Sequence, residues 1–132
     1  RLLNYYDIDN RFYLVDAPGY GYAHGGIDLH RLFNEMMNSY FLDNRELKLV
    51  LVLLDGRRKI SENDREIIDY LLSNHIPFFL VITKTDKLNQ SEKAALYKHL
   101  KENHINVEHV FFTSALVAKS LVPLQKAIEK VL

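Results

Sequence analysis

The sequence predicts an α/β domain in which a mainly parallel β-sheet has helices on both faces, giving three layers. Short runs of Leu, Val, Ile and Phe, which are typical of strands, alternate with stretches whose apolar residues recur every three to four positions. Two of these runs, 47–54 and 78–82, are almost entirely apolar, as expected of strands buried on both faces of a parallel sheet. A chain of 132 residues with 48% hydrophobic residues is large enough to build the core of one such domain.

The N-terminal part predicts an antiparallel hairpin followed by a helix. Residues 2–9 and 12–16 are apolar and β-prone, and the short polar segment between them suits a tight turn. After a candidate N-cap at Asp28, apolar residues recur at helical spacing up to Phe41. One amphipathic helix is therefore expected before the first buried strand.

Three strand-and-helix pairs follow. Ser61 and Asp64 have the spacing of a capping box, in which the side chain of each residue bonds to the backbone of the other. Ser91 is expected to cap the next helix, with Ala94, Ala95 and Leu100 on its inner face. The predicted strands cover residues 47–54, 78–82 and 110–113, and the predicted helices cover residues 62–72, 91–103 and 121–132.

Polar residues follow three of the predicted strands. In open parallel α/β sheets, ligands bind beyond the carboxyl ends of the strands. These three segments are therefore the candidate binding site. They consist of Asp16, Ala17, Pro18 and Gly19 after the second hairpin strand, of Thr83, Lys84, Thr85 and Asp86, and of Thr113, Ser114 and Ala115.

The first segment suits a nucleoside triphosphate. Asp16 can hold Mg²⁺ directly or through a water molecule, and the backbone N–H of Gly19 can approach a terminal phosphate because no side chain intervenes. A carboxylate followed three residues later by glycine is also common where a strand simply ends in a polar turn. Both interpretations remain open for this segment.

The second and third segments favour guanine. The ring N–H and the exocyclic amine of guanine are adjacent donors, and the carboxylate of Asp86 offers two acceptors at the matching spacing. Adenine lacks this donor pair and would leave the acceptors unpaired. Lys84 would lay its aliphatic stem along the base, and the small residues 113–115 would direct backbone N–H groups to the guanine carbonyl. An exposed loop with a salt bridge is the alternative interpretation.

The three segments resemble the G3, G4 and G5 elements of the TRAFAC GTPases. Residues 16–23 read Asp-Ala-Pro-Gly-Tyr-Gly-Tyr-Ala, which is similar to the Asp-Leu-Pro-Gly-Tyr-Gly-Tyr-Ala of the Era-like EngB family of bacterial GTPases. Asp55 and Arg57 are similar to the family's Asp-x-Arg, and residues 83–86 match its Thr-Lys-x-Asp. The resemblance implies a P-loop GTPase fold, binding of GTP, GDP and Mg²⁺, and GTP hydrolysis. It also implies a cytoplasmic role in large ribosomal subunit assembly, cell division and septation.

The phosphate-binding loop of such GTPases is absent from this sequence. No Gly-x-x-x-x-Gly-Lys-Ser/Thr occurs, and the threonine of the G2 element would fall just before Arg1. We expect residues 1–132 to be the C-terminal two thirds of a longer protein, a single G domain without its P-loop strand and first helix. By resemblance, that strand would lie between the strands that end at Asp16 and Asp55, so two edges would lack a partner. Hydrolysis is expected of the complete protein and not of these residues alone.

One position differs from the Ras-type GTPases and is expected to slow hydrolysis, and one loop differs from the family pattern. Ras-type GTPases orient the attacking water with a glutamine after the glycine of the G3 element, and Tyr20 occupies that position here. Because a phenol cannot donate to and accept from one water as an amide does, slow intrinsic hydrolysis is expected. The loop after residues 113–115 continues with Val117 and Ala118 and lacks the glycine usual in the family.

Charge and composition indicate the expected partners. Seventeen basic and seventeen acidic residues balance, so no global field favours a polyanion such as DNA. Arg57, Arg58 and Lys59 form the densest basic cluster and are candidate contacts to ribosomal RNA phosphates, while a solvated face is equally compatible with them. The absence of cysteine fits a reducing compartment, no apolar run approaches the length of a membrane span, and a monomer is expected.

Two other functions remain open. Asp7 and Asp9 faintly resemble the motif of phosphatases with an aspartate nucleophile, but Asn10, Arg11 and the hairpin context argue against that activity. The chain can also be a non-catalytic docking or structural module, because half of the nucleotide site is absent from it. Guanine-selective binding is the property that separates these alternatives from a GTPase.

Overall fold

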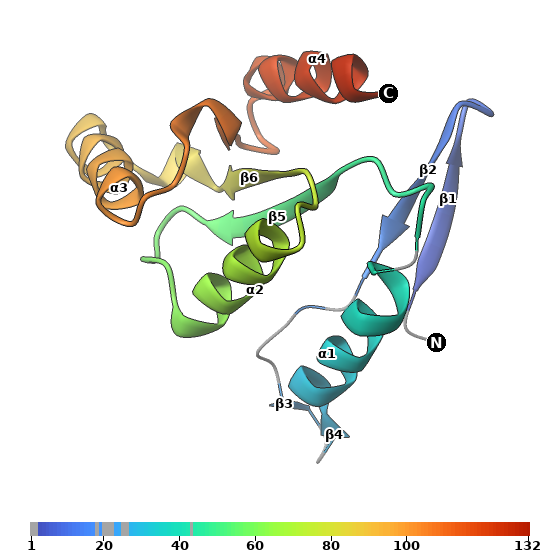
Figure 1. Ribbon diagram of the computed structural model, residues 1–132. Coiled ribbons are helices and arrows are strands. Elements are labelled where there is room, and N and C mark those ends of the chain that lie inside the picture. Colours follow the sequence, from blue (N-terminus) through green and yellow to red (C-terminus); the bar gives the residue numbers. More distant parts are fainter. Residues whose placement is uncertain (1–2, 18, 20–22, 25–26, 43) are drawn as a thin grey trace. The chain divides into compact units, whose positions relative to one another are not determined.

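The computed structural model describes residues 3–17, 19, 23–24, 27–42 and 44–132. The candidate site residues Pro18 and Tyr20 lie outside the described residues. The chain divides into two compact units, Arg1–Leu47 and Lys48–Val131, which are considered one at a time. Figure 1 labels helices α1–α4 and strands β1–β6. None of the helices in the described part of the chain has the length and apolarity that crossing a lipid bilayer requires.

The first unit begins with the predicted hairpin. Strands β1 (Asn4–Ile8) and β2 (Phe12–Asp16) pair antiparallel. Asp9 and Asn10 adopt positive φ angles of 54° and 56° in the turn, a conformation that Asp and Asn tolerate better than most residues. The Asn10 N–H also donates to Oδ1 of Asp7 at 2.9 Å. The local sequence between the strands therefore stabilises the turn.

The first unit also contains the predicted helix. Helix α1 (Leu29–Tyr40) begins directly after the short antiparallel pair β3 (Ala23–His24) and β4 (Ile27–Asp28). Met37 on this helix is buried, at 5% exposure. The β3–β4 pair was not expected from sequence, because two-residue strands have no periodicity to detect.

The second unit contains a parallel sheet in the order β5 (Val50–Asp55), β6 (Phe78–Thr83) and β7 (Val110–Phe112). The registers join Asp55 to Thr83 and Ile82 to Phe112. The three strands therefore end together, and the loops that follow them lie at one carboxyl edge of the sheet. The predicted α/β class with a parallel sheet and an N-terminal hairpin is confirmed.

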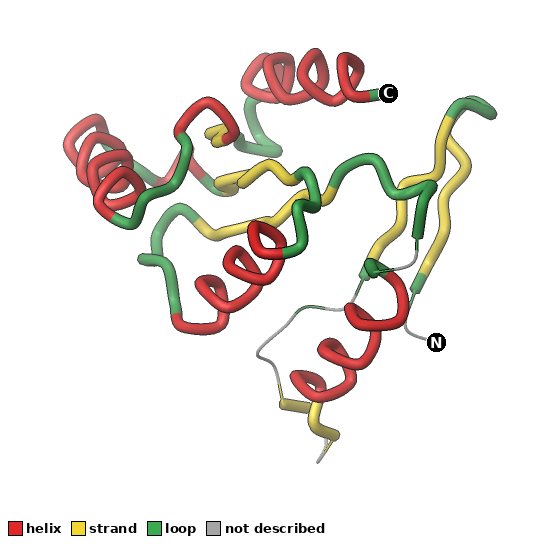
Figure 2. Tube along the Cα trace, viewed as in Figure 1, coloured by secondary structure: helices red, strands yellow, loops and turns green. Residues whose placement is uncertain are grey.

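Helices lie on both faces of this sheet. Figure 2 shows α2 (Glu62–Ser73) and α4 (Val122–Val131) on opposite sides of it, and α3 (Gln90–Glu102) connects β6 to β7. Phe79 and Val81 pack with Leu124 of α4 on one face. Their neighbours in β6, Leu80 and Ile82, point to the opposite face and are 0% and 1% exposed.

The capping box at the start of α2 is confirmed. The Asp64 N–H donates to Oγ of Ser61 at 3.1 Å, and the Ser61 N–H donates to Oδ2 of Asp64 at 2.9 Å. The cap predicted at Ser91 is wrong, because α3 is capped two residues earlier by Asn89. Asn89 forms a complete capping box with Glu92, with hydrogen bonds of 2.8 and 2.9 Å.

The buried face of α3 differs in part from the expectation. Leu96 and Leu100 are the buried residues of this helix, so the expectation is confirmed at Leu100 and is wrong at Ala94 and Ala95, which are exposed. The expectation that β5 is buried on both faces is also wrong at Leu53, whose exposure is 62%. Helix α4 begins one residue later than predicted and follows a 3₁₀ turn, η3 (Ala118–Leu121).

Candidate functional site

The loops after β5, β6 and β7 are joined by backbone hydrogen bonds at the carboxyl edge of the sheet. The Gly56 N–H donates to the carbonyl oxygen of Thr83 at 2.9 Å, and the Thr113 N–H donates to that of Ile82 at 2.8 Å. The Thr85 N–H donates to the carbonyl oxygen of Thr113 at 3.1 Å. Two of the three sequence-predicted segments, 83–86 and 113–115, are therefore brought together at one edge.

Threonine hydroxyls reinforce these joints. Thr85 donates from Oγ1 to the carbonyl oxygen of Thr113 at 2.8 Å, and Thr113 donates from Oγ1 to that of Ile82 at 3.0 Å. Both threonines are buried, at 6% and 3% exposure. Thr83 makes a longer bond of 3.4 Å to the carbonyl oxygen of Leu54. The hydroxyls of the predicted site threonines thus hold the loops in place.

The carboxylate of Asp86 is oriented by a buried serine. Oγ of Ser114 donates to Oδ1 of Asp86 at 2.8 Å and accepts from the Leu116 N–H at 3.1 Å. Ser114 is 2% exposed, whereas Asp86 is exposed. The arrangement presents a carboxylate to solvent in a fixed direction, which is the geometry required of a bidentate acceptor.

Lys84 reaches its position through an unusual backbone conformation. Its φ and ψ angles are 59° and 32°, in the left-handed region, and it precedes the 3₁₀ turn η1 (Thr85–Lys87). A left-handed residue other than glycine costs about 1 kcal/mol and is common at functional sites. The side chain of Lys84 is exposed, and its ammonium lies 3.6 Å from Oδ2 of Asp55.

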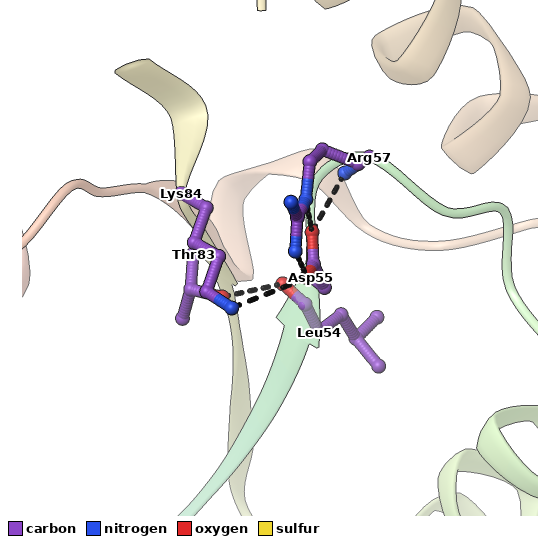
Figure 3. Close-up of polar contacts among 5 residues, drawn as sticks. All are labelled: Leu54, Asp55, Arg57, Thr83 and Lys84. Carbon is purple, nitrogen blue, oxygen red and sulfur yellow. Dashed lines mark hydrogen bonds and ion pairs between the residues drawn. The ribbon is translucent and has the colours of Figure 1, made fainter. Parts of the chain in front are cut away.

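Figure 3 shows that the carboxylate of Asp55 lies between Arg57 and Lys84. Arg57 donates from Nε to Oδ1 at 3.0 Å and from Nη2 to Oδ2 at 2.7 Å, and its backbone N–H also donates to Oδ1 at 3.0 Å. These bonds, first from the guanidinium and then from the backbone, hold the pKa of Asp55 well below its usual range. Sequence patterns had not indicated this pairing, and only the Asp-x-Arg resemblance singled out the two residues.

The pairing divides the basic cluster 57–59 into two kinds of residue. The guanidinium of Arg57 is engaged with Asp55, whereas Arg58 and Lys59 are exposed. The two latter residues are therefore the more available cations of the cluster for a phosphate partner.

The first sequence-predicted segment belongs to the other unit. Asp16 ends β2 opposite Asn4 and is exposed, as are Ala17 and Gly19. Among the described residues, no atom lies within 4 Å of the point where a Cβ on Gly19 would be. The segment therefore has an exposed carboxylate followed by a glycine that the described residues outside its immediate chain neighbours do not crowd.

Comparison with known proteins assigns the class. Residues 1–84 match the model of a protein family described as 50S ribosome-binding GTPase. This match covers more than half of the chain and, together with the Thr-Lys-x-Asp loop at the edge of a parallel sheet, places it among the GTPases of that family.

Three relatives illustrate this assignment and share one printed name. The chain is 32% identical to the "Probable GTP-binding protein EngB" of Chlorobium phaeobacteroides over 94% of its own length and 65% of that protein. The proteins of the same name from Thermosipho africanus and Prosthecochloris aestuarii are both 33% identical, over 96% and 98% of this chain and 66% and 67% of their own. The chain belongs to the EngB family, and it spans about two thirds of the length of these relatives.

Proposed function

We propose that this chain carries the guanine-recognising part of a GTP-binding switch protein. The observation that supports this proposal is the exposed carboxylate of Asp86, oriented by the buried hydroxyl of Ser114. Its two oxygens match the ring N–H and exocyclic amine of guanine, and no such donor pair exists in adenine. The relatives' printed name, a GTP-binding protein, agrees with this chemistry.

The remaining contacts to the base would come from Lys84 and Ala115. The Ser114 N–H and the Leu116 N–H are both used within the loop, by Oγ of Ser120 and Oγ of Ser114. The Ala115 N–H makes no hydrogen bond within the described part of the chain, and Ala115 is exposed. This N–H is the donor that we assign to the guanine carbonyl oxygen, with the stem of Lys84 along the base.

The phosphate side of the proposal rests on Asp16 and Gly19. Asp16 would hold Mg²⁺ through a water molecule, with the remaining oxygen ligands supplied by phosphate and solvent, because Mg²⁺ retains several waters. Gly19 would offer its N–H to the terminal phosphate, and Tyr20 would replace the water-orienting glutamine. We propose that the chain is part of a G domain whose P-loop strand and first helix precede it, and that the complete domain hydrolyses GTP to GDP.

The proposed partner is the large ribosomal subunit, during its assembly. The description of the matching family as ribosome-binding supports this assignment, and the exposed Arg58 and Lys59 are the residues that we assign to RNA phosphates, whereas the guanidinium of Arg57 is engaged with Asp55. A monomeric, cytoplasmic protein that supports cell division and septation is the corresponding cellular proposal. Replacing Arg58 and Lys59 by Ala should weaken ribosome binding and reduce its salt dependence.

Fluorescent GDP and ADP, titrated into this chain and into a form extended N-terminally through the P-loop, test the proposal. We expect the extended form to bind GDP and reject ADP by a factor of about 100 or more. We expect little binding to the chain alone, because the contacts to the phosphates are missing. Failure of the extended form to bind GDP would contradict the GTPase assignment and favour a docking module.

A further inference from the structure

The hydroxyl of Ser120 closes the loop that carries Ser114. Oγ of Ser120 accepts from the Ser114 N–H at 2.9 Å. It lies 2.6 Å from the carbonyl oxygen of Val117 and 3.1 Å from that of Ser114, and it can donate to either oxygen. A hydroxyl can donate and accept at once, so this one group bonds to both ends of the turn. Ser120 is half-buried in η3, six residues after Ser114.

The Ser120 hydroxyl closes this loop without the glycine that is usual in the family. The loop from Ser114 to Ser120 contains no glycine, and its described residues have no positive φ angle. The turn is held by two backbone bonds, from the Val117 N–H to Ser114 at 3.1 Å and from the Ser120 N–H to Val117 at 3.0 Å, in addition to the serine hydroxyl. A side chain therefore helps to close a loop that no left-handed residue bends.

The bonds continue from Ser120 to the base-recognition carboxylate. Ser120 fixes the backbone of Ser114, Ser114 directs its own hydroxyl to Oδ1 of Asp86, and Asp86 is exposed at the sheet edge. We infer that Ser120 is a positioning residue for guanine selectivity, acting through Ser114 on the carboxylate of Asp86. This inference rests on the proposed function, since it concerns the same base site.

Loss of the hydroxyl has a defined consequence. In a Ser120→Ala variant the Ser114 N–H loses its acceptor beside a fully buried side chain, and an unsatisfied donor in that position is costly. The backbone of Ser114 would shift towards another acceptor, and its hydroxyl would no longer hold Asp86 in one direction. A purely local role of Ser120 in η3 would instead lower stability without changing which base is preferred.

Inosine diphosphate separates these two roles. Inosine keeps the ring N–H and the carbonyl of guanine but lacks the exocyclic amine, so it loses one of the two donors to Asp86. In the N-terminally extended protein, the unsubstituted sequence should bind GDP about 10- to 100-fold more tightly than IDP, as expected for one hydrogen bond to a charged acceptor. The GDP/IDP affinity ratio therefore reports the orientation of the carboxylate.

The experiment measures GDP and IDP affinities for Ser120→Ala, Ser120→Thr and the matched control Lys119→Ala, whose side chain is exposed. Ser120→Ala should lower the ratio about 3- to 10-fold, Ser120→Thr should restore it, and Lys119→Ala should leave it unchanged. If Ser120→Ala does not fold, Ser120→Cys, which is a weaker donor and acceptor of similar size, should lower the ratio by a smaller factor.

The outcomes distinguish the two proposals. GDP binding with an unchanged GDP/IDP ratio in the Ser120 variants, or an equal loss of affinity for both nucleotides, would overturn the role of Ser120 and leave the proposed function intact. Absence of GDP binding by the unsubstituted extended protein would overturn the proposed function, and this inference with it.

Discussion

Two glycines follow strand-end carboxylates in this chain, and their surroundings differ. A Cβ on Gly56 would lie 3.0 Å from the carbonyl oxygen of Thr83, 3.1 Å from Cγ2 of Ile82 and 3.2 Å from Cδ1 of Leu88. At Gly19, by contrast, the described residues place no atom within 4 Å of that point. Gly56 is required by packing within its own unit, whereas nothing described around Gly19 requires the absence of a side chain.

The same contrast extends to the two groups of candidate residues, each within its own unit. On the base side, buried hydroxyls and backbone groups bond loops 83–86 and 113–120 to one another. On the phosphate side, Asp16, Ala17 and Gly19 are exposed. A glycine that leaves open space beside its backbone is the arrangement that an incoming phosphate needs.

The largest expected effect tests the base side. Asp86→Asn replaces two acceptors by one acceptor and one donor, a pattern that matches the ring N–H and the second carbonyl of xanthine. In the N-terminally extended protein, GDP affinity should fall by about 100-fold or more, and xanthosine diphosphate should become the preferred ligand. Competition against a fluorescent nucleotide measures both affinities. Retention of guanine preference by this variant would show that the base does not bind at Asp86.

The two glycines can be compared directly. Gly56→Ala should lower the free energy of unfolding of the chain by about 1–3 kcal/mol, because the new methyl group meets a backbone oxygen that cannot move away easily. Gly19→Ala should change it by less than about 0.5 kcal/mol. In the extended protein we expect GTP to protect residues 19–26 from hydrogen exchange, because their glycines suit a switch segment that orders around the terminal phosphate, and Gly19→Ala should abolish this protection. Urea unfolding and hydrogen exchange measure the two effects.

A different result would contradict each of the two predictions, the one on stability and the one on hydrogen exchange. Equal destabilisation by the two alanines would remove the distinction between a packing glycine and a ligand glycine. Unchanged GTP-dependent protection in Gly19→Ala would mean that this backbone does not approach the terminal phosphate.

Much of the fold was predictable because its signals are local. The alternation of apolar runs and helical stripes indicated the sheet, and the hairpin turn and the Ser61 capping box follow from neighbouring residues. The cap of α3 was also present in the sequence, since Glu92 stands three residues after Asn89, whereas Ala94 stands three after Ser91. The three-residue spacing of the capping box, applied consistently, selects Asn89.

The connections within the site were not predictable in the same way. The bond between Ser114 and Asp86 joins residues 28 positions apart, and it depends on the strand register that ends β6 and β7 together. The role of Ser120 depends on the path of an irregular loop. The left-handed conformation of Lys84 was not predictable either, because sequence indicates that conformation mainly at glycine. The sequence indicated residue types that suit nucleotide binding. The strand register and the path of the loops determine which of those residues are in contact.

A smaller effect is expected when a threonine hydroxyl that holds the loops of the base side is removed. Thr85→Val keeps the volume of the side chain but removes a buried bond of 2.8 Å, and it should lower the free energy of unfolding by about 1 kcal/mol. Thr83→Val is the matched control, because its bond is longer, at 3.4 Å, and its site is less buried. Urea unfolding should show a clearly smaller loss for Thr83→Val. Equal losses would mean that the hydroxyl bonds do not stabilise the loops in proportion to their geometry.

The smallest effect concerns the charged contact at Asp55 and depends on pH. Because Arg57 holds the pKa of Asp55 below its unfolded value of about 4, the contribution of this carboxylate is complete above that value and is lost as the pH falls through the lower, folded pKa. Asp55→Asn should therefore lower stability at pH 7 by less than Thr85→Val does, since the pair is partly exposed, and the difference from the unsubstituted chain should shrink between pH 4 and pH 2.

The hydrogen bonds of the threonine hydroxyls are the reference that shows whether the charge of Asp55 contributes to stability. Neither Thr85 nor Thr113 titrates, so the loss caused by Thr85→Val should remain the same across the pH range in which that of Asp55→Asn disappears. One molar salt should also reduce the effect of Asp55→Asn and leave that of Thr85→Val unchanged, because only the charged pair is screened. Parallel pH profiles for the two variants would show that the contribution of Asp55 does not depend on its charge, and the carboxyl edge would then be held by one kind of interaction throughout.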